Sequence, residues 1–253
     1  MIQATNLTKR YGRLTALNDV SFSVREGEVL GLIGPNGSGK TTLFECLGGV
    51  LPLDGGTVLQ DGHPLTASAR ASTLFYLPDG IAPWPSQTVR WALDFVERFF
   101  DGAGIGAGTG AGSRAYRACS PSRDEVVRQL DLEPILGAVI GTLSKGQRKR
   151  ALLAIGLLIR RPILLADEPF DGLDLRQSRE VALTLRAHAA GGRTMFLSIH
   201  QIGDAARVCD RFVLLSGGRV CGEGTLPELS GLAAARGAMT AGDDLEEVFL
   251  ALT

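Results

Sequence analysis

The segment GPNGSGKT, at residues 34–41, fits the pattern GxxxxGK[ST] and stands between an apolar run at 29–33 and a predicted helix at about 40–50. In that context, glycines allow backbone N–H groups to point inward around phosphate oxygens, at the positive end of the helix. Lys40 would reach the β- and γ-phosphates of a nucleoside triphosphate, and the Thr41 hydroxyl would bind Mg²⁺. A tight turn that matches by chance is the alternative, and the flanking elements weigh against it. The segment therefore predicts a nucleoside triphosphate site.

We expect the whole loop and the first helical turn to contact this nucleotide. Thr42 follows the motif directly and belongs to the same turn. The predicted contact residues are Gly34, Pro35, Asn36, Gly37, Ser38, Gly39, Lys40, Thr41 and Thr42.

The segment ILLADEP, at residues 163–169, places two carboxylates after an apolar stretch. The four apolar residues predict a buried strand, and doubly wound sheets bind their ligands at the carboxyl ends of such strands. Two adjacent carboxylates at a surface are usually solvated charge, but here they accompany a phosphate loop. We therefore expect Asp167 to hold Mg²⁺ and Glu168 to polarise the water that attacks the γ-phosphate.

Length and composition limit the class of protein. The 253 residues include 26 basic and 27 acidic side chains, so the chain has no bulk attraction to nucleic acid or anionic lipid. Its four cysteines form no CxxC pair, which favours reduced thiols in a cytosolic protein over a zinc site or a disulfide framework. The longest apolar run, residues 151–159, is shorter than the roughly 18 residues of a membrane span. A membrane function would need another subunit.

The order of predicted elements indicates a mostly parallel sheet with helices on its faces. Strands are expected first, helices next, and then strands alternating with helices. Predicted strands lie at 20–24, 29–33, 56–60, 72–77, 163–166, 194–199 and 211–215, predicted helices at 91–99, 124–132, from 175 and near 203, and a glycine-rich loop at 101–113.

The run LSKGQRKR, at residues 143–150, holds four cations and is either a solvated helix face or an anion site. Followed by a helix and then by ILLADEP, it resembles the signature of the ATP-binding cassette (ABC) family, with Lys145 where that family usually has glycine. The resemblance implies an α/β P-loop NTPase core, an N-terminal antiparallel β subdomain and an inserted helical subdomain. It divides a single domain, 1–253, into a core lobe of 1–83 and 161–253 and a helical part of 84–160.

The resemblance also implies a dimer of two cassettes paired head to tail. The signature of one cassette would then cap the γ-phosphate held by the other, and FDGLD, at 170–174, would cross the interface. We expect the remaining basic residues, Arg148, Lys149 and Arg150, to lie along the helix partly solvated. The residues assigned to the trans site are Ser144, Gly146, Gln147 and Asp174.

Three further residues take roles from the resemblance. Tyr11 is similar to the family's adenine-stacking aromatic residue, and His200 stands where the family has a histidine that contacts the γ-phosphate and orients the water. His63 and His188 have no such role. Asp79, in YLPDG at 76–80, occupies the place of the family's Mg²⁺-binding glutamine; it is either an altered metal ligand or a plain turn residue.

We expect the chain to be the ATP-hydrolysing subunit of an exporter-type ABC transporter, with ATP and Mg²⁺ as cofactors. Its expected partners are transmembrane permease subunits and a second ATP-binding subunit, with no nucleic acid, at the cytoplasmic face of a membrane. The segment DDLEEVFLAL, at 243–252, resembles exporter tails but is also an amphipathic helix pattern. A soluble ABC ATPase acting on ribosomes or DNA is the alternative, and an inactive nucleotide-binding regulator is a third.

Overall fold

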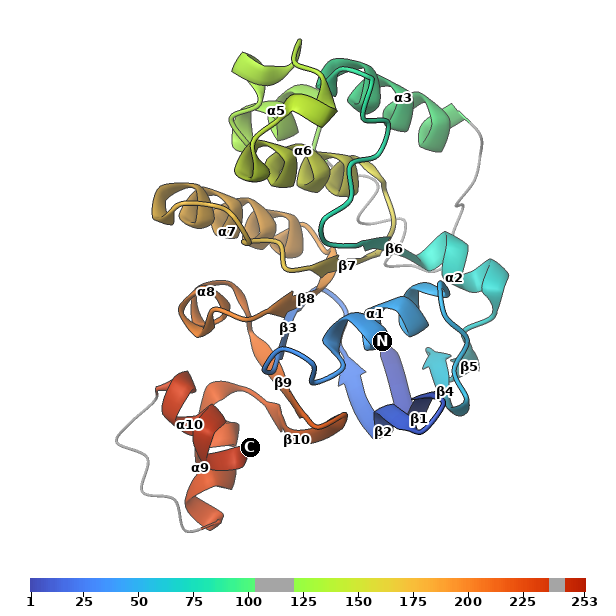
Figure 1. Cartoon of the computed structure of the whole chain (residues 1–253), viewed down its shortest axis with the longest axis vertical. Coiled ribbons are helices and arrows are strands. Elements are labelled where there is room, and N and C mark those ends of the chain that lie inside the picture. Colours follow the sequence, from blue (N-terminus) through green and yellow to red (C-terminus); the bar gives the residue numbers. More distant parts are fainter. Residues whose placement is uncertain (103–120, 237–243) are drawn as a thin grey trace.

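The computed structural model describes residues 1–102, 121–236 and 244–253, whose strands form two sheets (Figure 1). One sheet is mostly parallel and has the strand order β10–β9–β3–β8–β7–β6. The other is antiparallel and has the order β2–β1–β4–β5. This confirms the predicted α/β class with an N-terminal antiparallel β region. The strands are β1 Ile2–Tyr11, β2 Leu14–Val24, β3 Val29–Ile33, β4 Gly55–Gln60, β5 His63–Pro64, β6 Leu74–Leu77, β7 Ile163–Asp167, β8 Thr194–Ile199, β9 Arg211–Ser216 and β10 Arg219–Gly224.

The central strands β3, β7 and β8 are buried along their whole length. Strands of a parallel sheet are covered on both faces and are therefore built from continuous aliphatic runs, which is why the sequence predicts them well. The parallel register pairs Val29 with Met195 and Asp167 with Ser198. The carboxyl ends of these strands consequently lie side by side.

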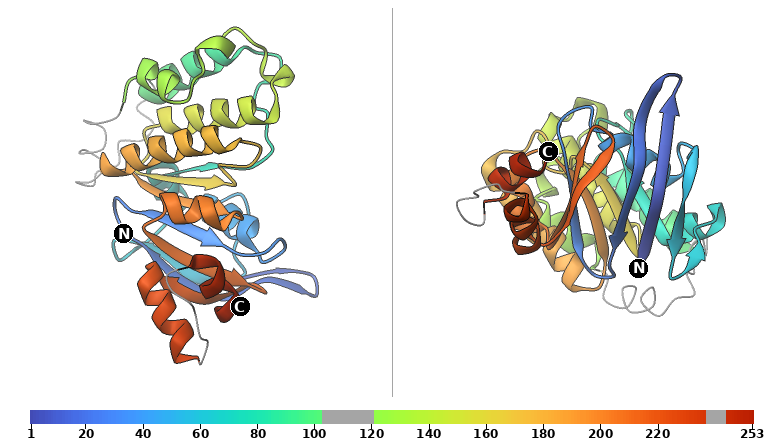
Figure 2. Two further views of the ribbon diagram at one scale, coloured as in Figure 1. Left: turned by 90° about the vertical axis from the view of Figure 1, so that its left-hand side faces the viewer. Right: turned by 90° about the horizontal axis from the view of Figure 1, so that it is seen from below.

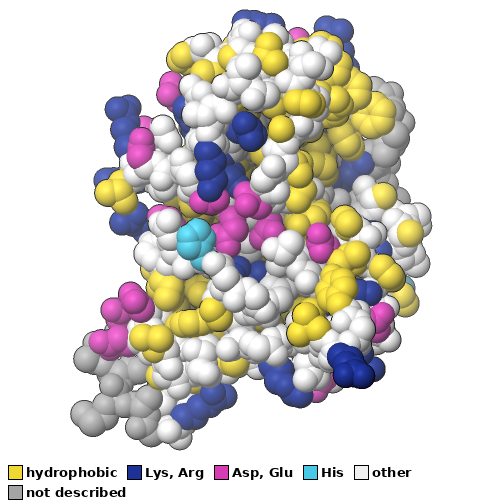
Figure 3. Space-filling view, viewed as in Figure 1, with side chains coloured by type: hydrophobic (Ala, Val, Ile, Leu, Met, Phe, Trp, Pro, Cys, Tyr) yellow, Lys and Arg dark blue, Asp and Glu magenta, His cyan; other side chains and the backbone are white. Residues whose placement is uncertain are grey.

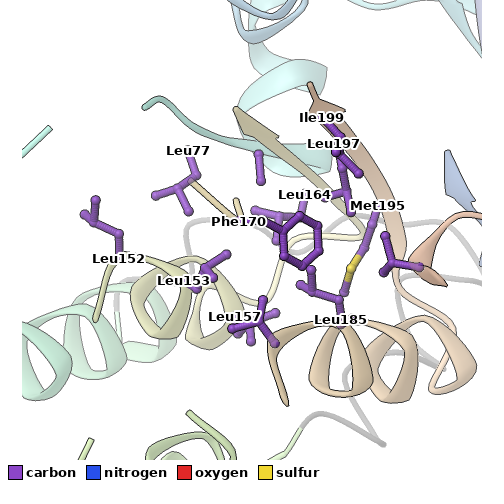
Figure 4. Packing of buried hydrophobic residues seen from close by; sticks show 14 of the residues in the cluster. Leu77, Leu152, Leu153, Leu157, Leu164, Phe170, Leu185, Met195, Leu197 and Ile199 are labelled. Carbon is purple, nitrogen blue, oxygen red and sulfur yellow. The ribbon is translucent and has the colours of Figure 1, made fainter. Parts of the chain in front are cut away.

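Helices cover the parallel sheet on one face. In Figure 4, Leu164, Met195 and Leu197 point from the sheet toward Leu157 and Leu185. Figure 2 shows these yellow and orange helices as a layer on the strands. The helices in contact with the strands are α6 Lys145–Leu158, α7 Leu175–Ala190 and α8 Ile202–Val208, whereas α3 Val89–Gly102 and α5 Arg123–Gln129 pack on α6.

The opposite face packs on α1, Lys40–Gly48, and on the antiparallel sheet. Phe196 of β8 contacts Phe22 of β2 and Phe44 of α1, with ring centroids 5.3 Å and 4.9 Å away. Aromatic rings of this kind bury large apolar areas and fix the relative position of the layers. The phosphate-loop helix is thus held between the two sheets.

One predicted strand, at 72–77, is partly wrong. Ala67–Thr73 forms the short helix α2, and strand β6 begins only at Leu74. The Thr66 side chain starts this helix because its hydroxyl accepts a hydrogen bond from the Ala69 N–H at 3.2 Å. Of the predicted glycine-rich loop at 101–113, residues 103–113 lie outside the described residues, and α3 continues through Gly102.

The expectation that the basic run is partly solvated is wrong for two of its members. Lys149 and Arg150 are only 5% and 7% exposed. Arg150 donates hydrogen bonds to the carbonyl oxygens of Leu130 and Asp131, at 2.9 and 2.8 Å. Buried cations of this kind are tolerated because each has its own acceptors.

The chain closes with α9, Leu226–Ala235, and α10, Leu245–Leu252. Leu245, Val248 and Leu252 of α10 are buried against the core, as its amphipathic pattern predicts. In the parts of the chain that the structure describes, no helix is long and apolar enough to cross a membrane.

Candidate active site

Four loops meet at the carboxyl edge of the parallel sheet. The strand order β3–β8–β7–β6 places the phosphate loop, His200, the Asp167–Glu168 pair and Asp79 in a row, because each lies at the end of its strand or within two residues after it. A pocket of about 580 Å³ lies at this edge, a size typical of small-ligand sites. Its lining consists of Tyr11, Leu14, Thr15, Ala16, Asn36, Gly37, Gly39, Lys40, Thr41, Thr42, Asp79, Asp167, Glu168, Gly217 and Gly218.

The phosphate loop has the backbone shape that its glycines predict. Gly39 has φ +107° and lies so close to the carbonyl of Ala16 that a Cβ atom would come within 2.6 Å of that oxygen. No other residue fits there without moving the backbone. Helix α1 begins at the next residue, Lys40, so the positive end of the helix lies at the pocket.

Lys40 is buried and directed back over the loop. Its Nζ donates to the carbonyl oxygens of Gly34 and Pro35, at 2.8 and 3.3 Å, and lies 3.9 Å from Glu168 Oε1. Gly34, Pro35 and Ser38 shape the loop and are not among the residues that line the pocket. The ammonium group therefore sits between the loop and the acidic pair.

Asp167 is fixed by two hydroxyl groups. Thr41 Oγ1 donates to Asp167 Oδ2 at 2.9 Å, and Ser198 Oγ donates to Asp167 Oδ1. Ser198 also accepts a hydrogen bond from the Glu168 N–H at 3.0 Å, so one buried serine orients both acidic residues. Sequence reasoning missed Ser198; its signal is a polar residue inside an otherwise apolar predicted strand.

Glu168 leaves the end of β7 with φ +48°, a left-handed conformation that is uncommon for a residue with a side chain. Its Oε2 lies 2.6 Å from Nδ1 of His200. The histidine does not line the pocket itself and reaches it through this contact. The structure thus brings together Lys40, Glu168 and His200, which are far apart in the sequence.

Oxygen donors gather beside Lys40. The Thr41 hydroxyl and the Asp167 carboxylate are in contact, and Asp79 lines the same pocket. Hydroxyl and carboxylate oxygens form the hard donor set that Mg²⁺ requires, so the residues present fit this ion.

Asp79 has a partner that the sequence does not predict. Its Oδ1 accepts a hydrogen bond from Lys149 Nζ of α6 at 2.5 Å. The side chain is 39% exposed, while Lys149 is buried. Asp79 therefore both faces the pocket and binds the signature helix.

Tyr11, the last residue of β1, also lines the pocket, and its ring is exposed. The ammonium of Lys9 lies 5.8 Å from the ring centroid. Gly217 and Gly218, in the turn between β9 and β10, also line the pocket. The sequence alone does not predict them as site residues. Figure 3 shows acidic side chains gathered near the middle of this face, with Lys and Arg side chains next to them.

The residues assigned to a trans site lie outside this pocket. Ser144 and Asp174 are the N-caps of α6 and α7, and each forms a capping box with the glutamine three residues later, Gln147 or Gln177. Gly146 packs so close to Gly172 that a Cβ atom would lie 2.8 Å from the Gly172 carbonyl oxygen. The two helix N-termini therefore lie side by side.

Lys145, the departure from the family's glycine, folds over the turn before α7. Its Nζ lies 2.5 Å from Asp171 Oδ2. The hydrogen bond from this ammonium holds the pKa of the Asp171 carboxyl below its usual range. The signature helix is thus bound to the loop that follows the acidic pair.

A phosphate loop follows β3, and an acidic pair stands at the end of β7 in the same parallel sheet. Together these two features define a P-loop nucleoside triphosphatase. The sequence model of the ABC transporter family matches residues 17–171, and the chain belongs to this family as an ATP-binding subunit with ATPase chemistry.

Relatives act in both directions of transport. The chain is 35% identical to the Nod factor export ATP-binding protein I of Burkholderia orbicola over 228 residues, which cover 88% of this chain and 70% of the relative. It is 34% identical to the sulfate/thiosulfate import ATP-binding protein CysA of Caulobacter vibrioides over 221 residues, covering 87% and 63%.

Solved cassettes have the same fold. An ATP-binding subunit of an ABC transporter superposes with a TM-score of 0.80 at 27% identity and covers 100% of this chain and 99% of its own. The dimeric bacterial ABC transporter cassette MJ0796 superposes with a TM-score of 0.73 at 27% identity, covering 89% and 98%.

Proposed function

We propose that the pocket binds ATP with its phosphates on the loop and its adenine against Tyr11. The position of Lys40 carries this proposal: its ammonium lies at the positive end of α1, 3.9 Å from the acidic pair. A triphosphate at this place would exchange the carbonyl contacts of Lys40 for phosphate oxygens. The remaining contacts come from the loop and the first turn of α1.

Thr41 and Asp167 would hold Mg²⁺, and Asp79 would be the third protein ligand. In the alternative, Asp79 is a plain turn residue and stays outside the metal site. Held by these residues, the ion would supply positive charge that offsets the phosphates. Ser198 keeps the Asp167 carboxylate in place through its hydrogen bond. Second partners of this kind commonly fix the ligands of a metal.

Glu168 acts as the general base for the attacking water, and His200 orients that base and contacts the γ-phosphate. The distance of 2.6 Å between the two side chains supports this pairing. A base must lie within hydrogen-bond reach of its water, and its orientation by a neighbour makes that geometry persistent.

Two cassettes pair head to tail, so that Ser144, Gly146 and Gln147 cap the γ-phosphate in the partner's pocket and Asp174 lies at the interface. The position of these residues outside their own pocket supports this arrangement. A helix N-terminus such as that of α6 presents N–H groups suited to a phosphate. The core lobe of 1–83 and 161–253 and the helical part of 84–160 then contribute opposite halves of each site.

The cassette drives export through separate membrane subunits at the cytoplasmic face of a membrane. An exposed aromatic row on α3 supports a docked partner: Trp91, Phe95 and Phe99 are partly exposed and stack at 5.2 and 5.5 Å. Figure 3 shows hydrophobic side chains covering this upper right part of the surface. Exposed apolar areas of this kind mark interaction sites. The Nod factor export names of several relatives support the direction.

Calorimetry with ATP tests the site. The variant Lys40→Ala should lose measurable nucleotide binding, because it removes the charge opposite the phosphates. Arg176→Ala is a matched control, since it removes a cation that is 88% exposed and paired with Glu180. Equal affinity in Lys40→Ala and in the native protein would refute the phosphate-loop assignment.

Purification from membranes tests the partner. The native protein should copurify with a hydrophobic subunit, whereas Phe95→Ser should bind ATP normally and lose that subunit. Copurification with ribosomes or DNA instead would overturn the transporter class.

A further inference from the structure

Asp79 brings a negative charge to a place where phosphates bind. It lines the nucleotide pocket together with Lys40, Thr41 and Asp167. A neutral amide at this position would meet the γ-phosphate without repulsion, but a carboxylate opposes it. The pocket therefore needs a compensating cation near Asp79.

Lys149 is placed to compensate this charge. Its side chain comes from the second turn of α6, is buried, and ends 2.5 Å from Asp79 Oδ1. Among the described residues, the Asp79 side chain makes this one hydrogen bond, and it makes it through Oδ1. The other carboxylate oxygen, Oδ2, therefore keeps its lone pairs for another ligand. Burial removes water from the ammonium, and a carboxylate at hydrogen-bond distance compensates for that loss.

We propose that Lys149 is a positioning residue for Mg²⁺ and ATP, acting through Asp79. Like a neutral amide, the Lys149–Asp79 ion pair carries no net charge, and it leaves one carboxylate oxygen for the pocket. It also connects the metal side of the pocket to the signature helix. The proposal rests on the proposed ATP site and deepens it.

The neighbouring ion pair on α6 provides a comparison. Lys145 lies four residues earlier, one helical turn away, and binds Asp171 at 2.5 Å. Asp171 does not line the pocket. Loss of the Lys145 charge should therefore change the metal dependence of ATP binding less than loss of the Lys149 charge, since Lys145 reaches Asp79 only through a longer-range electrostatic interaction.

Binding of a fluorescent ATP analogue to the purified full chain, with EDTA and with saturating Mg²⁺, tests the proposal. In Lys149→Met, affinity in EDTA should fall about tenfold, since an unpaired carboxylate then faces the phosphates across a partly dehydrated site. With Mg²⁺ the loss should be smaller, because the ion lies next to the carboxylate. Lys149→Arg should bind like the native protein, and Lys145→Met should change the ratio of the two affinities less than Lys149→Met does.

The double variant Lys149→Met/Asp79→Asn separates positioning from structure. It should regain native affinity in EDTA within about threefold, because removal of the second charge restores neutrality. If the double variant binds as weakly as Lys149→Met, the lysine only supports the fold and the proposal is wrong. Native affinities in Lys149→Met would also overturn it. A normal affinity in Lys40→Ala would instead refute the ATP site itself, so the two failures are distinguishable.

Discussion

His200 and Glu168 are in direct contact: Nδ1 of the imidazole lies 2.6 Å from Oε2 of the carboxylate. The other carboxylate oxygen lies 3.9 Å from the Lys40 ammonium. The contact joins the ends of β7 and β8, which are neighbours in the sheet. We infer from this contact that His200 orients the proposed base.

Loss of this contact should slow hydrolysis and spare binding. In His200→Ala, steady-state ATPase activity should fall roughly 10- to 100-fold, the worth of one hydrogen bond to a charged group. The affinity for ATP should change little. The exposed residue His63 supplies the control, and His63→Ala should turn over normally. Native turnover in His200→Ala would remove the histidine from the mechanism.

The signature should act on the opposite cassette. A mixed dimer of Ser144→Arg and Lys40→Ala chains has one site with both lesions and one intact site, if the signature caps the partner's loop. If it caps its own loop, each site carries one lesion and both fail. With membrane subunits present, ATPase assays on purified mixed dimers should show activity, whereas each variant alone should be inactive. An inactive mixed dimer counts against the trans arrangement, provided one intact site suffices.

A buried histidine should make the fold sensitive to acid. His188 is 4% exposed, and neither ring nitrogen has a hydrogen-bond partner among the described residues. Burial, and then the nearby Arg193 charge, lower its pKa to about 3. The unfolded chain, with a pKa near 6.5, binds the proton first as pH falls, so this residue's stability contribution is present above about pH 6.5 and is lost toward pH 3.

Chemical denaturation at pH 7.5 and 5.5 checks the size of this effect. The native protein should lose roughly 1.4 kcal/mol of unfolding free energy over that interval relative to His188→Leu, which does not titrate. His63→Asn, at an exposed position, should show the same pH dependence as the native protein. Parallel pH curves for native protein and His188→Leu would show that His188 does not titrate differently on unfolding.

Much of the fold follows from continuous apolar runs. The strands β3 and β8 have the predicted bounds because they are buried from both sides and most of their residues are large and apolar. β1 gives a weaker signal, since register shifts after Ala4, Leu7 and Lys9 break its alternation. The short helix α2 consists mostly of Ala, Ser and Thr and has little apolar periodicity to detect.

The site is predictable where one residue acts through a local motif and unpredictable where its role comes from a distant partner. The phosphate loop and the acidic pair belong to the first kind. Ser198 and Lys149 belong to the second, because their partners lie 31 and 70 residues away in the sequence. From the sequence, a run of basic residues predicts a solvated helix face. In the folded chain, Lys149 and Arg150 are buried because other segments provide acceptors for their charges.

The central claim is that Glu168 activates the water in a site that binds ATP through Lys40. Single-turnover hydrolysis of ATP by Glu168→Gln, together with calorimetric ATP binding, tests it most directly. The account predicts native affinity, hydrolysis slowed by roughly 10²-fold or more, and a stable ATP-bound dimer. Near-native hydrolysis by Glu168→Gln would contradict it and assign the water to another residue.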